Sequence, residues 1–179
     1  RVQFRELKSG KCLPHRVKPT EVWAKPWLHA GVNFASGDSD SDDGNHNTFF
    51  NLLPTNHLYY GYADQLAFQN LVDLFLQLKL TPLPKLGIEI AFHQFWLHER
   101  KDLRYFGTGA FTRSALGLGG SSSGGSNNIG QEIDAILSYR VHRAATILLG
   151  YSRLFGGGVF GSMSHENTDW GFAEIRLHY

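Results

Sequence analysis

The chain has 179 residues, enough for one domain, and its single cysteine, Cys12, cannot form a disulfide within the chain. Its 17 basic and 16 acidic residues give a net charge of +1, which excludes the strongly basic surface of a nucleic-acid-binding protein. No apolar run approaches the roughly 18 residues of a transmembrane helix. A membrane-spanning β-strand is still allowed, because it needs only about 9–11 residues with apolar side chains at alternate positions.

Six segments show this alternation, which is typical of strands with one apolar face. In chain order they are 27–36, 70–81, 86–97, 131–141, 145–155 and 170–179. The segment 70–81 is rich in leucine, which favours a helix. Its apolar residues nevertheless fall on five consecutive even positions, Val72 to Leu80, and a helical period would scatter them. We therefore predict a strand there as well.

The links between the six segments alternate strictly between long and short. Short links lie at 82–85 and around 142–143, whereas the long ones, 37–69, 98–130 and 156–168, are rich in Gly, Ser, Asn and Asp. Outer-membrane β-barrels sort their connections in this way, with short periplasmic turns and long extracellular loops. The last segment then runs toward the periplasm and ends at Tyr179, as in the terminal strand that barrels present to their assembly machinery.

We therefore expect an all-β fold, an antiparallel transmembrane β-barrel of the outer-membrane type. A sheet cannot leave an open edge in lipid, and bacterial single-chain barrels have at least eight strands. Residues 27–179 are accordingly assigned to the last six to eight strands of a larger barrel. Two more strands come either from 1–26 and 57–66 or from N-terminal strands outside this sequence, and we favour the second alternative. The N-terminal segment 1–26 is poorly defined, and we assign it to the end of a preceding strand and a turn.

Tyrosine and tryptophan residues lie near the ends of the predicted strands. Such rings are typical of the aromatic girdles that face lipid headgroups. The candidates are Trp27, Trp96, Tyr139, Tyr151, Trp170 and Tyr179.

Several stretches resemble the alginate export family of outer-membrane barrels over about residues 27–179. The most specific runs from Leu53 to Asp64 (Leu-Pro-Thr-Asn-His-Leu-Tyr-Tyr-Gly-Tyr-Ala-Asp). The others are Phe34–Asp38, Thr48-Phe49, Gln69-Asn70, Phe95–Leu97, Glu132–Asp134 and Gly150–Ser152. The resemblance implies a monomeric, many-stranded barrel with a polar lumen in the bacterial outer membrane. In members that export alginate, a polyuronate, it implies a strongly basic lumen.

The predicted function is an outer-membrane channel for passive transport or export of a polar or anionic solute, with an alginate-like polysaccharide as one candidate. One alternative is a structural or adhesive barrel whose loops bind partners, and another is a soluble β-sandwich binding module. No nucleophile–base arrangement and no phosphate-binding motif is present, so we expect no enzymatic activity. The expected partners are outer-membrane lipid, the barrel-assembly machinery and the solute, with no nucleic acid.

Charged side chains on the polar side of the strands are the candidate lumen-lining residues. They are Asp73, Lys79, Glu89, His93, Glu132, Asp134, Arg140, Glu174, Arg176 and His178. Acidic residues outnumber basic ones in this set, whereas anion selectivity requires a ring of cations.

One loop carries a candidate cation site. Asp38, Asp40 and Asp42 alternate ahead of Gly44 in the stretch 38–44, and calcium prefers such oxygen ligands. The glycine comes one position late for an EF-hand, so a solvated turn is the competing interpretation. We expect no other cofactor.

Overall fold

The computed structural model describes residues 23–40, 42–52, 59–107, 117–161 and 167–178. Residues 1–22, and with them most of the N-terminal segment and Cys12, lie outside this part, as does Tyr179. The described residues are almost entirely strand and loop. The strands are β1 (Trp27–Ala35), β2 (Leu71–Leu83), β3 (Leu86–Leu97), β4 (Arg104–Tyr105), β5 (Gly120–Ser121), β6 (Asn128–His142), β7 (Ala145–Gly156) and β8 (Thr168–Leu177).

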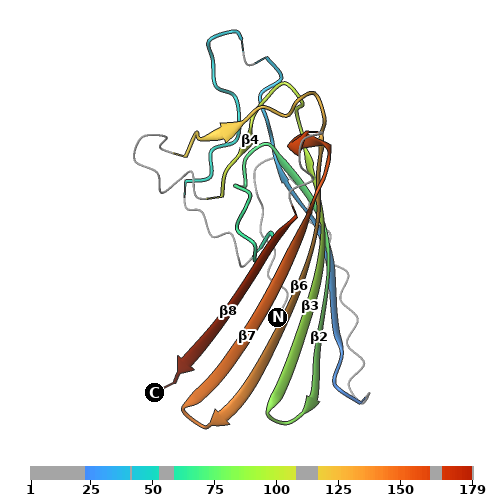
Figure 1. Ribbon diagram of the computed structural model, residues 1–179, viewed down its shortest axis with the longest axis vertical. Helices are drawn as coiled ribbons and strands as arrows, with labels where there is room; N and C mark the ends of the chain where they lie inside the picture. Colours follow the sequence, from blue (N-terminus) through green and yellow to red (C-terminus); the bar gives the residue numbers. More distant parts are fainter. Residues whose placement is uncertain (1–22, 41, 53–58, 108–116, 162–166, 179) are drawn as a thin grey trace.

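Six of these strands form one antiparallel sheet in the order β1-β2-β3-β6-β7-β8 (Figure 1). All six predicted strands are confirmed, including the leucine-rich segment that became β2. Each strand pairs with its sequence neighbour in the sheet, as expected for an up-and-down β-barrel wall. Within the described residues β1 and β8 are the edges, so the sheet is an open segment of such a wall.

The sheet has one apolar face, which is exposed. Leu74 and Leu76 of β2 are each 47% exposed, and Ile133 of β6 is 44% exposed. Ile175 of β8 reaches 69%. In a water-soluble β-sandwich these side chains would be covered by a second sheet. The other sheet formed by the described residues has two strands of two residues, β4 and β5.

The connections are sorted by length between the two ends of the sheet, as predicted. The short turns at Pro84-Lys85 and Arg143-Ala144 lie at one end, here called the turn end, and the long connections lie at the other, the loop end (Figure 1). Strand β8 also ends at the turn end (Figure 1). The antiparallel ladders and the lengths of the connections therefore agree on the direction of each strand.

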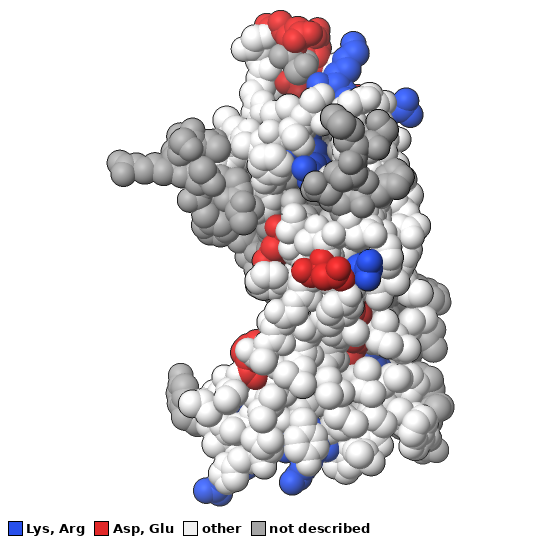
Figure 2. Space-filling model, viewed as in Figure 1, with Lys and Arg blue, Asp and Glu red and all other residues white. Residues whose placement is uncertain are grey.

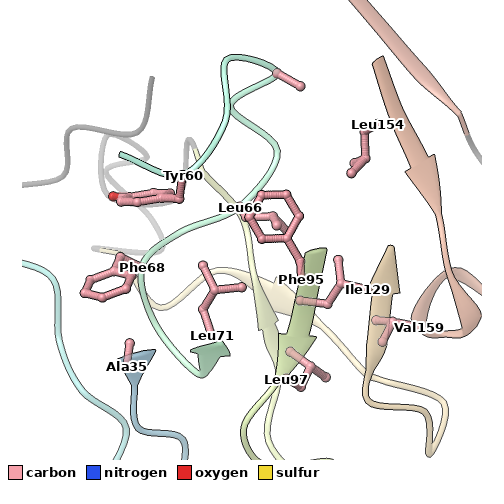
Figure 3. Packing of buried hydrophobic residues seen from close by; sticks show 11 residues of the cluster. Ala35, Tyr60, Leu66, Phe68, Leu71, Phe95, Leu97, Ile129, Leu154 and Val159 are labelled. Atoms are coloured by element: carbon pink, nitrogen blue, oxygen red, sulfur yellow. The ribbon is translucent and has the colours of Figure 1, made fainter. Parts of the chain in front are cut away.

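A cluster of apolar side chains packs together at the loop end (Figure 3). Leu71, Phe95 and Leu154 come from strand ends, and Leu66 and Phe68 come from the long β1–β2 connection. Phe95 and Leu154 are fully buried. The main buried apolar core of the described residues thus lies between loops and strand ends rather than between two layers.

The segment 59–66, a candidate for an extra strand, adds no strand to the main sheet. Its only ladder contact among the described residues is an isolated bridge between Leu66 and Phe106. This alternative does not hold for residues 59–66, because the Tyr62 and Ala63 N–H groups bond to side chains of the sheet instead. Residues 53–58 lie outside the described part. No helical segment of the described chain has the length and apolar character needed to cross a bilayer.

Candidate functional site

The face opposite the exposed leucines is the polar face. Strand register links Asp73 to Phe95, His93 to Glu132, and Asp134 to Ser152 across adjacent strands, so these side chains share one side of the sheet. By the same parity it carries every predicted lumen-lining residue, namely Asp73, Lys79, Glu89, His93, Glu132, Asp134, Arg140, Glu174, Arg176 and His178. We describe it from the loop end to the turn end.

A buried cluster of acidic side chains and one histidine occupies the half of the polar face nearer the loop end. His93 Nδ1 lies 3.0 Å from Asp73 Oδ1, and His93 Nε2 lies 3.7 Å from Asp134 Oδ2. The imidazole stacks on the ring of Phe95, with centroids 5.4 Å apart. Asp73 is 0%, Asp134 1% and Glu132 2% exposed. The structure therefore brings four predicted residues together but buries them.

Part of this cluster is covered by residues 59–66, here called the covering loop. The Ala63 N–H donates to Glu132 Oε1 at 2.8 Å, and the Tyr62 N–H approaches Asp134 Oδ1 at 3.4 Å. Gly61 has φ +89°, and a Cβ there would overlap the Glu132 carboxylate. The loop backbone thus lies directly on the two carboxylates, and a glycine is required at the point of contact.

An aromatic stack ties the covering loop to β8. The Tyr62 ring lies 5.8 Å from the ring of Phe172, with an angle of 16° between their planes. Phe172 in turn lies over Gly150 of β7, where a Cβ would overlap its ring. The loop is therefore fixed to the sheet both by charged acceptors and by aromatic packing.

The cluster does not form a nucleophile–base pair. The Ser152 hydroxyl donates to the Asp134 carboxylate, and not to a histidine nitrogen. His93 is held between Asp73 and Asp134. Activation of a hydroxyl requires a base within hydrogen-bond reach, usually an imidazole. The arrangement positions the covering loop over the carboxylates, and it leaves Asp134 Oδ2 buried without a hydrogen-bond partner.

Toward the turn end the polar face carries exposed charges. Lys79 Nζ pairs with Glu89 Oε2 at 2.9 Å, with side chains 46% and 20% exposed. Arg176 Nε pairs with Glu174 Oε1 at 2.6 Å, with side chains 54% and 42% exposed. Arg140 is exposed and has no ion-pair partner among the described residues. Ion pairs between lumen-lining candidates are therefore found on β8 and between β2 and β3.

Basic side chains continue to the tip of the turn end. His178 Nε2 lies 3.3 Å from the Thr146 hydroxyl, and Thr146 is the cross-strand neighbour of both Arg140 and Arg176. Figure 2 shows Lys and Arg atoms at this lower tip of the molecule. The polar face is thus graded, with buried carboxylates toward the loops and more exposed charges of both signs toward the turns.

At the loop end a hydrogen-bond network joins two long connections. Asp102 accepts from the Thr48 hydroxyl at 2.6 Å, from the Tyr105 hydroxyl at 2.8 Å and from the Asp38 N–H at 2.9 Å. Burial raises the pKa of Tyr105 above its ordinary range, which keeps this hydroxyl a donor. Asn70, fully buried, donates to the carbonyls of Glu99 and Leu103 and accepts from the Glu99 N–H.

The predicted calcium ligands form turns within the first long connection. Asp38 accepts from the N–H groups of Asn47 and Asp40 at 2.9 and 3.0 Å, and these bonds hold the pKa of its carboxyl below its ordinary value. The Asp40 carboxylate accepts from the Asp42 N–H at 3.4 Å. In the described part of the chain no three His, Cys, Asp or Glu side chains gather as a metal site. Calcium binding by this stretch stays a prediction.

The girdle prediction is wrong for two tryptophans. Trp27 pairs with Lys79 and Trp170 with Ser152, which places both indoles on the polar face. Tyr139 and Tyr151 do lie on the apolar face, 46% and 49% exposed. Strand alternation alone predicts the polar face for Trp170, because residue 170 shares its parity with Glu174 and Arg176.

The sequence also gave no indication of the residues that bury the cluster. Asn33 donates to Asp73 at 2.9 Å, and Gly61, Tyr62 and Ala63 contact the carboxylates from a connection that was predicted as an external loop. Loop residues follow no strand period, so their contacts with the sheet could not be read from alternation.

An open antiparallel wall with one exposed apolar face and one polar, charge-bearing face is the arrangement of part of a membrane β-barrel. Residues 20–173 match the model of the alginate export family, and the chain belongs to that family. The alginate export family is a transport family of the outer membrane. A comparison with curated proteins gave no match.

Proposed function

We propose that this chain forms part of the wall of an outer-membrane channel that exports an anionic, alginate-like polysaccharide. The polar face lines the lumen, the apolar face contacts lipid, and the turn end lies in the periplasm. Passage is diffusive, and no covalent step is involved.

The observation that carries the proposal is the unequal exposure of the charges on the polar face. The sequence alone predicts a lumen with more acidic than basic groups. In the structure Asp73, Glu132 and Asp134 are at most 2% exposed. Exposed Lys79, Arg140 and Arg176 remain near the turn end. Glu89 and Glu174 neutralise two of these cations, and Arg140 is exposed without an ion-pair partner among the described residues. A polyanion entering there meets a net positive charge, and attraction of this kind raises local ligand concentration.

The experiment is single-channel recording of the full-length protein in planar bilayers with asymmetric salt. We expect a conducting pore with anion preference, and we expect the double variant Arg140→Glu with Arg176→Glu to shift that preference toward cations. Arg153→Glu is the control, because Arg153 pairs with Asp169 from the apolar face. Cation preference in the unmodified protein would contradict the proposal.

A second candidate is a plugged structural or adhesive barrel. The covering loop and the apolar cluster at the loop end favour it, because both place protein over the polar face. The same recording separates the two functions, since a plugged barrel conducts no ions.

A further inference from the structure

The polar face of β8 carries an exposed indole that lipid contact does not explain. Trp170 is 45% exposed and pairs with Ser152, whose hydroxyl bonds to the buried Asp134. A tryptophan facing water leaves a large apolar surface hydrated, at a cost that rises with the exposed area. On a wall whose opposite face is the apolar one, such a side chain fits a ligand rather than a bilayer.

The neighbours of Trp170 on the same face continue as a mixed strip. Phe172 follows at the next position of this face, and then Glu174 and Arg176. The Phe172 ring is held between Gly150 and Tyr62, so its orientation is fixed by packing. The Tyr62 side chain lies within electrostatic reach of both Glu174 and Arg176. The strip thus combines rigid aromatic surfaces with charged hydrogen-bonding groups.

The charged part of the strip keeps donors for a ligand. Arg176 uses Nε and one terminal nitrogen on the two oxygens of Glu174, at 2.6 and 3.1 Å. A guanidinium has five N–H donors in a planar fork, and that geometry suits a carboxylate. With 54% of its side chain exposed, Arg176 can bind a second carboxylate from the open side.

We propose that Trp170, Phe172, Tyr62 and Arg176 form a carbohydrate subsite for an acidic polysaccharide, a proposal that rests on the proposed function. A pyranose ring has an apolar face of C–H groups and a rim of hydroxyls. The Trp170 indole stacks on that face, as aromatic side chains do with other flat ligands. Arg176 binds the carboxylate of a uronate further along the chain. Residues 170 and 176 are about 20 Å apart along the strand, enough for several sugar units.

The test is calorimetric titration of the detergent-solubilised full-length protein with two probes, a short oligouronate and a neutral maltooligosaccharide of equal length. We expect Trp170→Ala to weaken binding of both about tenfold or more, because stacking does not depend on charge. Arg176→Gln should weaken only oligouronate binding. Tyr139→Ala is the matched control, since Tyr139 is 46% exposed on the apolar face, and it should change neither affinity.

Heat-modifiable gel mobility checks that each variant folds. The conservative variant Trp170→Phe keeps an aromatic ring and should retain most of the sugar affinity. Unchanged binding in Trp170→Ala, or no binding of either probe to the unmodified protein, overturns the subsite. Conductance is scored separately. If the protein conducts ions but Trp170→Ala leaves sugar binding unchanged, the subsite is contradicted and the proposed function is supported. If Trp170→Ala weakens sugar binding but the protein conducts no ions, the subsite is supported and the channel function is contradicted.

Discussion

The loop end and the turn end of the same polar face are built in opposite ways. At the loop end, charged and polar side chains are buried and bonded to backbone groups of the connections, as Asn70, Asp102 and Glu132 are. At the turn end, Lys79, Arg140 and Arg176 are exposed. A buried polar group costs free energy unless it is bonded, whereas an exposed one is solvated by water. The loop end is therefore structural, and the turn end is free to meet a solute.

The largest effect is expected at Asn70. Its side chain makes three hydrogen bonds to the second long connection, and its φ of +49° suits asparagine better than alanine. We expect Asn70→Ala to lower the free energy of unfolding by about 3 kcal/mol, because buried partners lose their bonds. Urea unfolding from lipid vesicles measures it. Asn45→Ala, at an exposed position, is the control. Equal midpoints for both variants would show that the loop end is not the structural half.

An intermediate effect is expected where the covering loop contacts the sheet. Gly61→Ala places a Cβ against the Glu132 carboxylate, so the covering loop must move away from the sheet. We expect about 2 kcal/mol of destabilisation and a higher single-channel conductance. Gly44→Ala is the control. Gly44 has φ +81°, so alanine there introduces backbone strain, but no atom lies within 4 Å of its Cβ position and no overlap with a neighbour results. If the two variants conduct alike, the covering loop does not narrow the channel.

A smaller effect on stability is expected at the turn end. Glu89→Gln removes the partner of Lys79 from a partly exposed pair, and solvent screening limits the contribution of such pairs to about 1 kcal/mol. Anion preference should increase because Lys79 keeps its charge. Reversal potentials and urea midpoints measure the two responses. A large loss of stability with unchanged selectivity would reverse the roles assigned to the two ends.

The smallest effect is a response of the first long connection to acid. Bonds from the N–H groups of Asn47 and Asp40 hold the pKa of Asp38 below its ordinary value of 3.8 in the folded protein. Stability from this carboxylate is thus present above pH 3.8 and is lost as the pH falls through the lower, folded-state pKa. Amide hydrogen exchange at Asp40 and Asn47 should quicken over that range beyond its normal pH dependence. Asp38→Asn supplies the baseline, and an identical pH profile in that variant would contradict the assignment.

The sequence by itself determined the six strands, the face of each side chain and the sorting of short and long links. Strand alternation depends only on the backbone, whose side chains point to opposite faces at successive residues, so Leu76 and Gln77 could be assigned before any contact was known. The same parity placed all ten charged candidates on one face. Parity also places Trp170 on this face. The girdle prediction missed this because it relied on the tendency of aromatic rings to face lipid headgroups.

Tertiary structure alone decided which of those charges a solute can meet. In the sequence, Glu132 and Arg176 count equally as charges of the lumen. In the structure, Glu132 is 2% exposed, whereas 54% of the Arg176 side chain is exposed. The difference arises because Gly61, Tyr62 and Ala63, some seventy residues away in sequence, lie on Glu132 and Asp134. A loop has no period to reveal its partners, and burial is a property of what covers a side chain rather than of the side chain itself.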